Sequence, residues 1–159
     1  LGDFFNYPDK TMAIGRLDVN SEGLLLLTTN GKLSEEIRSK KVEKEYYVQV
    51  DGCITQKEVN ILNKGVVIGF NGKKYTTKPC KTSLIPVPNF KDRTQKIRDD
   101  RHGPTSWISI ILKEGKFRQV RKMTAAVGFP TLRLVRVRIG AVLLDNLKLG
   151  EVKKVSNFL

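Results

Sequence analysis

"GRLDVNSEGLLLLTTNG", residues 15–31, joins a charged loop to one of the most apolar stretches of the chain. Arg16 and Asp18 lie two residues apart in it, and four consecutive leucines follow them. A short apolar run that ends at turn residues is typical of a buried strand. We therefore expect a strand over residues 24–28 that holds the loop with Arg16 and Asp18 in place.

The composition points to a folded protein that binds a polyanion. With 159 residues, 40% of them hydrophobic, the chain can form one domain with its own core. Its 29 Lys and Arg residues against 16 Asp and Glu residues give a net charge of +13. Eight basic residues and a single acid, Glu114, lie between Lys113 and Arg138. A surface that is only soluble mixes its charges, so this clustering favours a nucleic acid as partner.

Cysteine and histidine are too scarce for several kinds of site. The sequence contains two cysteines, Cys53 and Cys80, and one histidine, His102, which are too few for a Cys₂His₂ zinc site. His102 lies in a polar loop with Gly and Pro beside it, so a Ser-His-Asp hydrolase is not expected. Two cysteines fit a reducing compartment, and no apolar run is long enough to span a bilayer. We expect no metal and no membrane partner, and a cytoplasmic location such as the bacterial cytosol.

Periodicity and turn residues predict an α+β protein. We expect helices over residues 34–41, 55–65 and 118–128, and strands over residues 24–28, 45–50, 66–68, 75–77, 106–112 and 135–139. Runs of strands interrupted by helices indicate a mixed, mostly antiparallel sheet with flanking helices. Residues 86–104 hold three prolines and little periodicity, so they form a long irregular segment.

The last of these strands is expected to be basic on one side. Strict alternation would direct Val135, Val137 and Ile139 one way and Arg136 and Arg138 the other.

Asp18 is the strongest candidate for a reactive group, because the chain offers no metal site and no pair of histidines. An isolated aspartate in a loop is more often a turn residue that bonds its own backbone. A carboxylate near nucleic acid needs a close cation to stay ionised, and Arg118 or Arg121 can supply one. Tyr46 and Tyr47 are adjacent on a strand, so one faces the core and the other can face outward to stack on a base.

Four segments carry a resemblance to a known family. "GRLDVNSEGLLLLTTNG" resembles the aspartate motif of pseudouridine synthases of the ribosomal small-subunit synthase A type. "KEYYV" (44–48), "EGKFRQVRKM" (114–123) and "LVRVRIG" (134–140) are similar to further motifs of that family, in the same order. The segment 86–104 and "VGFPTLRL" after the last helix most resemble the branch called ribosomal large-subunit pseudouridine synthase E.

The resemblance implies a pseudouridine-synthase-like catalytic domain that isomerises uridine to pseudouridine in RNA without metal or cofactor. Asp18 would be the nucleophile and Arg121 its ion-pair partner, and Tyr46 would stack on the base and assist proton removal. Arg16 would fill the space left by the flipped base, and Leu134 would pack in the pocket. The remaining residues expected to bind the RNA are Arg118, Gln119, Lys122 and Arg136.

The resemblance also implies an organisation and a substrate. We expect residues 1–159 to be a single catalytic domain that lacks the family's first strand and has no S4-type RNA-binding domain. We expect a monomer that acts on large-subunit ribosomal RNA. The alternative is a non-catalytic basic RNA-binding or ribosome-associated module, in which Asp18 is dispensable and the arginines are not. No helix-turn-helix or zinc-finger spacing supports a DNA-binding protein.

Overall fold

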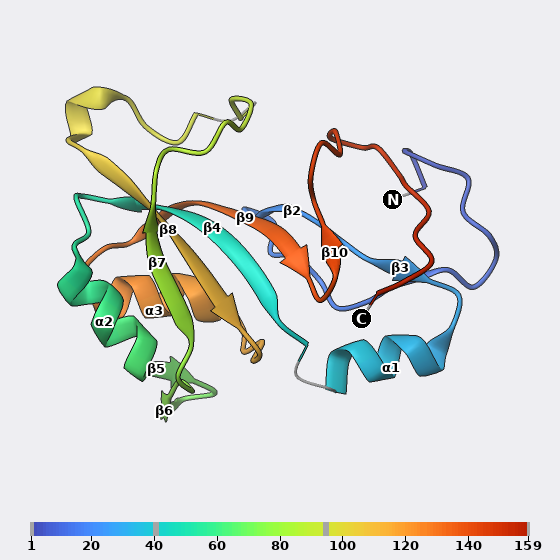
Figure 1. Cartoon of the computed structure of the whole chain (residues 1–159), viewed down its shortest axis with the longest axis horizontal. Helices are drawn as coiled ribbons and strands as arrows, with labels where there is room; N and C mark the ends of the chain where they lie inside the picture. Colours follow the sequence, from blue (N-terminus) through green and yellow to red (C-terminus); the bar gives the residue numbers. More distant parts are fainter. Residues whose placement is uncertain (1, 40–41, 94–95, 159) are drawn as a thin grey trace.

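The computed structural model describes residues 2–39, 42–93 and 96–158. Its elements in chain order are β1 (Met12–Ala13), β2 (Glu22–Gly23), β3 (Leu27–Thr28), α1 (Gly31–Ser39), β4 (Lys44–Asp51), α2 (Gln56–Lys64), β5 (Val67–Phe70), β6 (Lys73–Thr76), β7 (Lys81–Ile85), the 3₁₀ turn η1 (Asp100–His102), β8 (Thr105–Leu112), α3 (Gln119–Ala126), β9 (Thr131–Ile139) and β10 (Val142–Leu143). Figure 1 shows the long strands crossing the middle of the molecule, with α2 and α3 packed beside them. Helix α1 and both chain ends lie at the other end.

The central sheet is mixed and mostly antiparallel, as the sequence predicts. Its strands follow the order β10-β9-β4-β8-β7, and each neighbouring pair is antiparallel. The short strand β2 pairs with β9 in parallel. The pair β1–β3 and the hairpin β5–β6 form two separate two-stranded sheets. The predicted α+β fold is therefore confirmed.

Two apolar cores flank this sheet. The larger one fills the space between the sheet and helices α2 and α3; its most buried members include Val48, Val50, Leu62, Ile108, Ile110 and Met123. The second joins α1 to the N-terminal segment and the end of β9; it contains Ile14, Leu24, Leu26, Ile37, Val42, Ile139 and Val142. Strand β4 lies between β8 and β9 along almost its whole length, so it is the centre of the fold.

The leucine run does not form the strand that its apolarity predicts. Residues 24–26 link β2 to β3 and are not part of either strand. The prediction is wrong for residues 24–26 and confirmed for Leu27–Thr28, which form β3. The chain changes partners here, because β2 pairs with β9, whereas β3 pairs with β1. Leu24 and Leu26 are nevertheless buried, so the run anchors the preceding loop through its side chains.

Helix α1 begins at Gly31, three residues before the predicted start at Ser34. The side chain of Asn30 accounts for this difference, since its Oδ1 accepts the N–H groups of Lys32 at 3.0 Å and Leu33 at 3.2 Å. This is the usual way for an asparagine to cap a helix. The predicted end of the helix, at residues 40–41, lies outside the described residues.

A bulge in β9 overturns the expected alternation of its arginines. Opposite Glu45 lies Arg138, but opposite Tyr46 lies Arg136, so Val137 is the extra residue. Directly opposed residues point to the same face of a sheet. Arg136 therefore shares a face with Tyr46, while Arg138 points to the other face with Glu45.

The irregular segment 86–104 covers the second face of the sheet. Phe90 packs between Tyr47 and Trp107, with ring centroids 6.1 and 5.9 Å away. Arg98 pairs with Asp51 at 2.6 Å, which fastens the far end of the segment. Residues 94–95 lie outside the described residues. None of the helices in the described part of the chain has the length and hydropathy to cross a membrane.

Adjacent residues of α2 test the larger core. Leu62 is 0% exposed and Ile61 is 41% exposed. We expect Leu62→Ala to lower the free energy of unfolding by about 2–5 kcal/mol, because it leaves a cavity. Ile61→Ala is the matched control and should cost less than about 1 kcal/mol. Urea unfolding of both variants measures the difference, and equal losses would contradict this packing.

Candidate functional site

Asp18 opens a tight turn at the edge of the sheet. The N–H of Ser21 donates to the carbonyl of Asp18 at 2.9 Å, which closes the turn over residues 18–21. Asp18 is half-buried, whereas Val19 and Asn20 are exposed. The turn leads directly into β2, so the position of the carboxylate depends on what holds that short strand.

Arg121 reaches this turn from α3. Its Nη2 donates to the carbonyl of Asn20 at 2.7 Å and to Ser21 Oγ at 3.3 Å. Burial lowers the pKa of Arg121, nearby Arg118 lowers it further, and Asp18 raises it. The two predicted partners thus interact electrostatically, but the hydrogen bonds of the guanidinium go to the turn around Asp18.

Arg136 of β9 bonds the backbone on both sides of the Asp18 turn. It is only 5% exposed, and its Nε donates to the carbonyl of Leu24 at 2.8 Å. Its Nη1 reaches the carbonyl of Arg16 at 3.4 Å. Two of the donors of Arg136, a predicted RNA contact, thus bond the protein's own backbone. Tyr46 lies opposite it on β4, on the same face of the sheet.

Glu22 forms a second attachment for β2. Arg133 binds its carboxylate in a bidentate manner, with Nε and Nη2 each 2.9 Å from one oxygen. Arg93 adds a third contact at 3.3 Å, from the irregular segment on the far side of the sheet. Sequence analysis missed this cluster, because only the parallel pairing of β2 with β9 brings Glu22 to Arg133.

Two guanidinium donors at the site have no acceptor. Across the described residues, the buried side-chain nitrogens and oxygens without a hydrogen-bond partner are Arg98 Nε, Arg121 Nε and Arg136 Nη2. Buried polar groups are almost always paired in folded proteins. Two of these three nitrogens belong to the arginines that hold the Asp18 turn. A ligand with oxygen acceptors would satisfy them.

The other predicted residues have different environments. Arg118 is exposed at the start of α3 in the left-handed region (φ 52°), and Arg16 is exposed beside the Asp18 turn. The ammonium of Lys122 donates to the carbonyl of Gly69 at 2.7 Å. Leu134 is buried in the larger core, so its side chain supports the site from inside.

Gln119, also predicted to contact RNA, is buried and bonds within the protein. Its Nε2 donates to Glu114 at 2.8 Å, and its Oε1 accepts the N–H of Lys116 at 3.0 Å. It fixes the turn before α3. Glu114, the one acid of the basic segment, is its partner, and no periodic pattern in the sequence indicates this pairing.

The site therefore offers a half-buried carboxylate beside cations. Arg121 of α3 and Arg136 of β9 both bond the segment that contains Asp18, and Tyr46 of β4 lies opposite Arg136. Within the described residues, no group of three or more His, Cys, Asp or Glu side chains could hold a metal ion. A carboxylate in this setting can act as a nucleophile or a base on a ligand that the arginines bind.

Comparisons with known proteins show the family of this chain. A family model described as RNA pseudouridylate synthase matches residues 3–126. Ribosomal large subunit pseudouridine synthase E of Vibrio parahaemolyticus is 40% identical over 157 residues, which cover 98% of this chain and 64% of that protein. The protein of the same name from Xanthomonas axonopodis pv. citri is 40% identical over 146 residues, covering 90% and 75%. A crystal structure of a pseudouridylate synthase superposes with a TM-score of 0.76 at 31% identity, covering 97% of this chain and 60% of that one. The chain thus spans less than two thirds of the Vibrio protein.

Gly23 tests the packing beneath the site. Its φ is +103°, and a Cβ at this position would collide with the backbone carbonyl of Arg136. We expect Gly23→Ala to lower the free energy of unfolding by about 2 kcal/mol or more, because the collision separates β2 from β9. Gly31→Ala in α1 is the control, since no atom lies within 4 Å of the added methyl. It should be neutral or slightly stabilising in urea unfolding; a Gly23→Ala protein as stable as that control would contradict the β2–β9 pairing.

Proposed function

We propose that this chain, which belongs to the RNA pseudouridylate synthase family, isomerises a uridine of ribosomal RNA to pseudouridine. The observation that carries the proposal is the placement of Asp18 in a turn that Arg121 and Arg136 hold from two other elements. An ordinary turn aspartate is held by hydrogen bonds to its own backbone. Here two arginines from other elements fix the segment that contains Asp18, which favours a functional role.

In the proposed reaction the Asp18 carboxylate attacks the flipped uridine, at the ribose or at the uracil ring, and the bond that it forms breaks again before the product leaves. The bond between the ribose and uracil N1 breaks, the base turns, and a new bond forms from the ribose to C5. The C5 hydrogen leaves as a proton and N1 gains one, so the product is an isomer of the substrate. No oxidant or reductant is consumed, which is why we propose a reaction without metal or redox cofactor.

The neighbours of Asp18 have separate roles in this proposal. Arg121 Nε and Arg136 Nη2, which lack acceptors, would bind oxygen atoms of the flipped nucleotide. Tyr46 lies on the same face of the sheet as Arg136 and would stack on the base. Stacking on an aromatic ring contributes roughly 1–3 kcal/mol per base. Arg16, exposed beside the turn, would enter the space that the base has left.

RNA binding would supply the energy to flip the base. Extrusion of a nucleotide costs a few kcal/mol, and phosphate contacts can offset it. Arg118 is exposed at the start of α3 and is a proposed phosphate ligand, with Lys122 one turn further along. The related enzymes are called ribosomal large subunit pseudouridine synthases, so we propose large-subunit ribosomal RNA as the substrate. A monomer acting in the cytoplasm is part of the same proposal.

Asp18→Asn is the decisive variant. Incubated with protein-free ribosomal RNA that carries tritium at uracil C5, the parent protein should release tritium and Asp18→Asn should release none, because the amide is not a nucleophile. Asp9→Asn, in an exposed turn, is the matched control and should keep full activity. Release by Asp18→Asn at the parent rate would reject Asp18 as nucleophile. Tight, salt-sensitive RNA binding by the parent without release would favour the non-catalytic module, which the high net charge also supports.

Alanine variants of Arg121 and Arg118 should differ in whether they change the reaction rate or the RNA affinity. Arg121 holds the Asp18 turn, so we expect Arg121→Ala to lower the single-turnover rate at saturating RNA by at least tenfold, with a smaller effect on Kd. Arg118→Ala should raise Kd and leave that rate unchanged, because Arg118 is exposed and makes no contact with the turn in the described structure. Equal effects of the two variants on rate and on Kd would argue against a positioning role for Arg121.

A further inference from the structure

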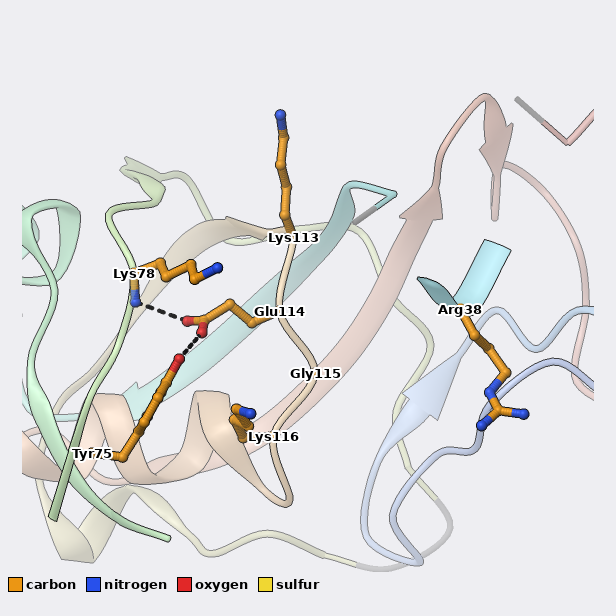
Figure 2. Close-up of a pocket in the computed structure, with 7 residues that line it drawn as sticks. All are labelled: Arg38, Tyr75, Lys78, Lys113, Glu114, Gly115 and Lys116. Atoms are coloured by element: carbon orange, nitrogen blue, oxygen red, sulfur yellow. Dashed lines mark hydrogen bonds between the residues drawn. The ribbon is translucent and has the colours of Figure 1, made fainter. Parts of the chain in front are cut away.

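A basic pocket of about 280 Å³ lies beside the start of α3, separate from Asp18. We call it the 113–116 pocket; its lining residues are Arg38, Tyr75, Lys78, Lys113, Glu114, Gly115 and Lys116. The four cations and one carboxylate among them give a net charge of +3. Figure 2 shows Arg38, from α1, across the pocket from Tyr75 and Lys78.

The single carboxylate of the pocket is already occupied. Glu114 accepts a hydrogen bond from the hydroxyl of Tyr75 and one from the N–H of Lys78 at 2.9 Å (Figure 2). It accepts a third from Gln119 Nε2 at 2.8 Å. Burial raises the pKa of Glu114, but these hydrogen bonds outweigh it and lower the pKa below its usual value. Glu114 is thus a structural anion that fixes the floor of the pocket.

The cations of the pocket remain available for a ligand. Among the ion pairs of the described residues, none involves Arg38, Lys78, Lys113 or Lys116. The ammonium of Lys116 lies over the rings of Phe70 and Tyr75, 4.9 and 5.1 Å from their centroids. These rings hold the ammonium in position without neutralising its charge.

The pocket is mechanically joined to the Asp18 site. Gln119 bonds both Glu114 and the N–H of Lys116, and it is the first residue of α3. Arg121, two residues further along this helix, holds the Asp18 turn. One rigid helix therefore sets the distance between the pocket and the proposed reacting centre.

The chemistry of the pocket favours a phosphate over a base. Its volume is near the lower limit of small-molecule sites, about 300 Å³, so it admits a phosphodiester or a single nucleotide. Lys116 covers the aromatic faces on which a base would stack. Lysine ammonium groups bind phosphate as point charges, and arginine adds bidentate hydrogen bonds.

We propose that the 113–116 pocket binds a backbone phosphate of the RNA, at a nucleotide other than the one that reacts. This inference rests on the proposed RNA substrate but not on the chemistry of Asp18. The pocket contributes affinity and register, so its loss weakens binding without slowing the reaction of bound RNA.

The test measures binding of a large-subunit ribosomal RNA transcript in an Asp18→Asn background, where no reaction is required. The pocket variant is Lys78→Gln with Lys113→Gln, because both side chains are exposed. Lys57→Gln with Lys64→Gln, two exposed lysines of α2, removes the same charge elsewhere. We expect the pocket variant to raise Kd about tenfold over this control, as for the loss of a charged hydrogen bond. The slope of log Kd against log salt should become shallower by about 1.

Equal Kd values and slopes for the two double variants would overturn the proposal. The pocket would then bind an anion other than the RNA. Arg38→Gln, from the opposite side of the pocket, is the second variant and should weaken RNA binding in the same direction. Urea midpoints equal to the parent's establish that each variant is folded. Failure of the parent to release tritium would reject the proposed function, whereas the binding comparison would still decide the pocket.

Discussion

The bonds from the Arg136 guanidinium to the backbone carbonyls of Arg16 and Leu24 are the constraint on which the candidate site depends. Strand β2 is two residues long, and a ladder of that length cannot hold a loop by itself. Hydrogen bonds from a charged donor contribute about 1.5–3 kcal/mol each. Arg136 thereby fixes both ends of the segment that contains Asp18, and it does so from β9, in the middle of the sheet.

The same arginine makes the site electropositive. The buried guanidinium of Arg136 bonds carbonyls, and none of the ion pairs between described residues involves it. Burial lowers the pKa of Lys44, and Arg136 lowers it further, so its charge is felt by its neighbours. An uncompensated buried cation is costly in a protein alone. It becomes favourable when a polyanion such as RNA covers it.

Local signals predicted the regular elements, and tertiary contacts decided the rest. Strand β4 and helix α2 were predicted correctly because alternation and the Thr55–Glu58 capping box act within a few residues. The first part of the leucine run, residues 24–26, was mistaken for a strand, since only its pairing partners determine that it crosses between two sheets. The orientation of Arg136 depends on a bulge opposite β4, which strict alternation cannot show. Of the basic residues that appeared as one cluster in the sequence, Arg133, Arg136 and Arg138 on β9 all bond other parts of the protein, although Arg136 Nη2 has no acceptor.

The span of chain between the two halves of the site determines when it can form during synthesis. Arg136 comes 112 residues after Leu24, and Arg121 comes 101 residues after Asn20. A nascent chain leaves the ribosome N-terminus first. The Asp18 segment and its leucines therefore emerge before the β9 residues that they contact. Contacts of such long separation form slowly. The growing chain therefore forms the site only after β9 has been synthesised, and until then Leu24 and Leu26 lack the core contacts with Ile139 and Val142.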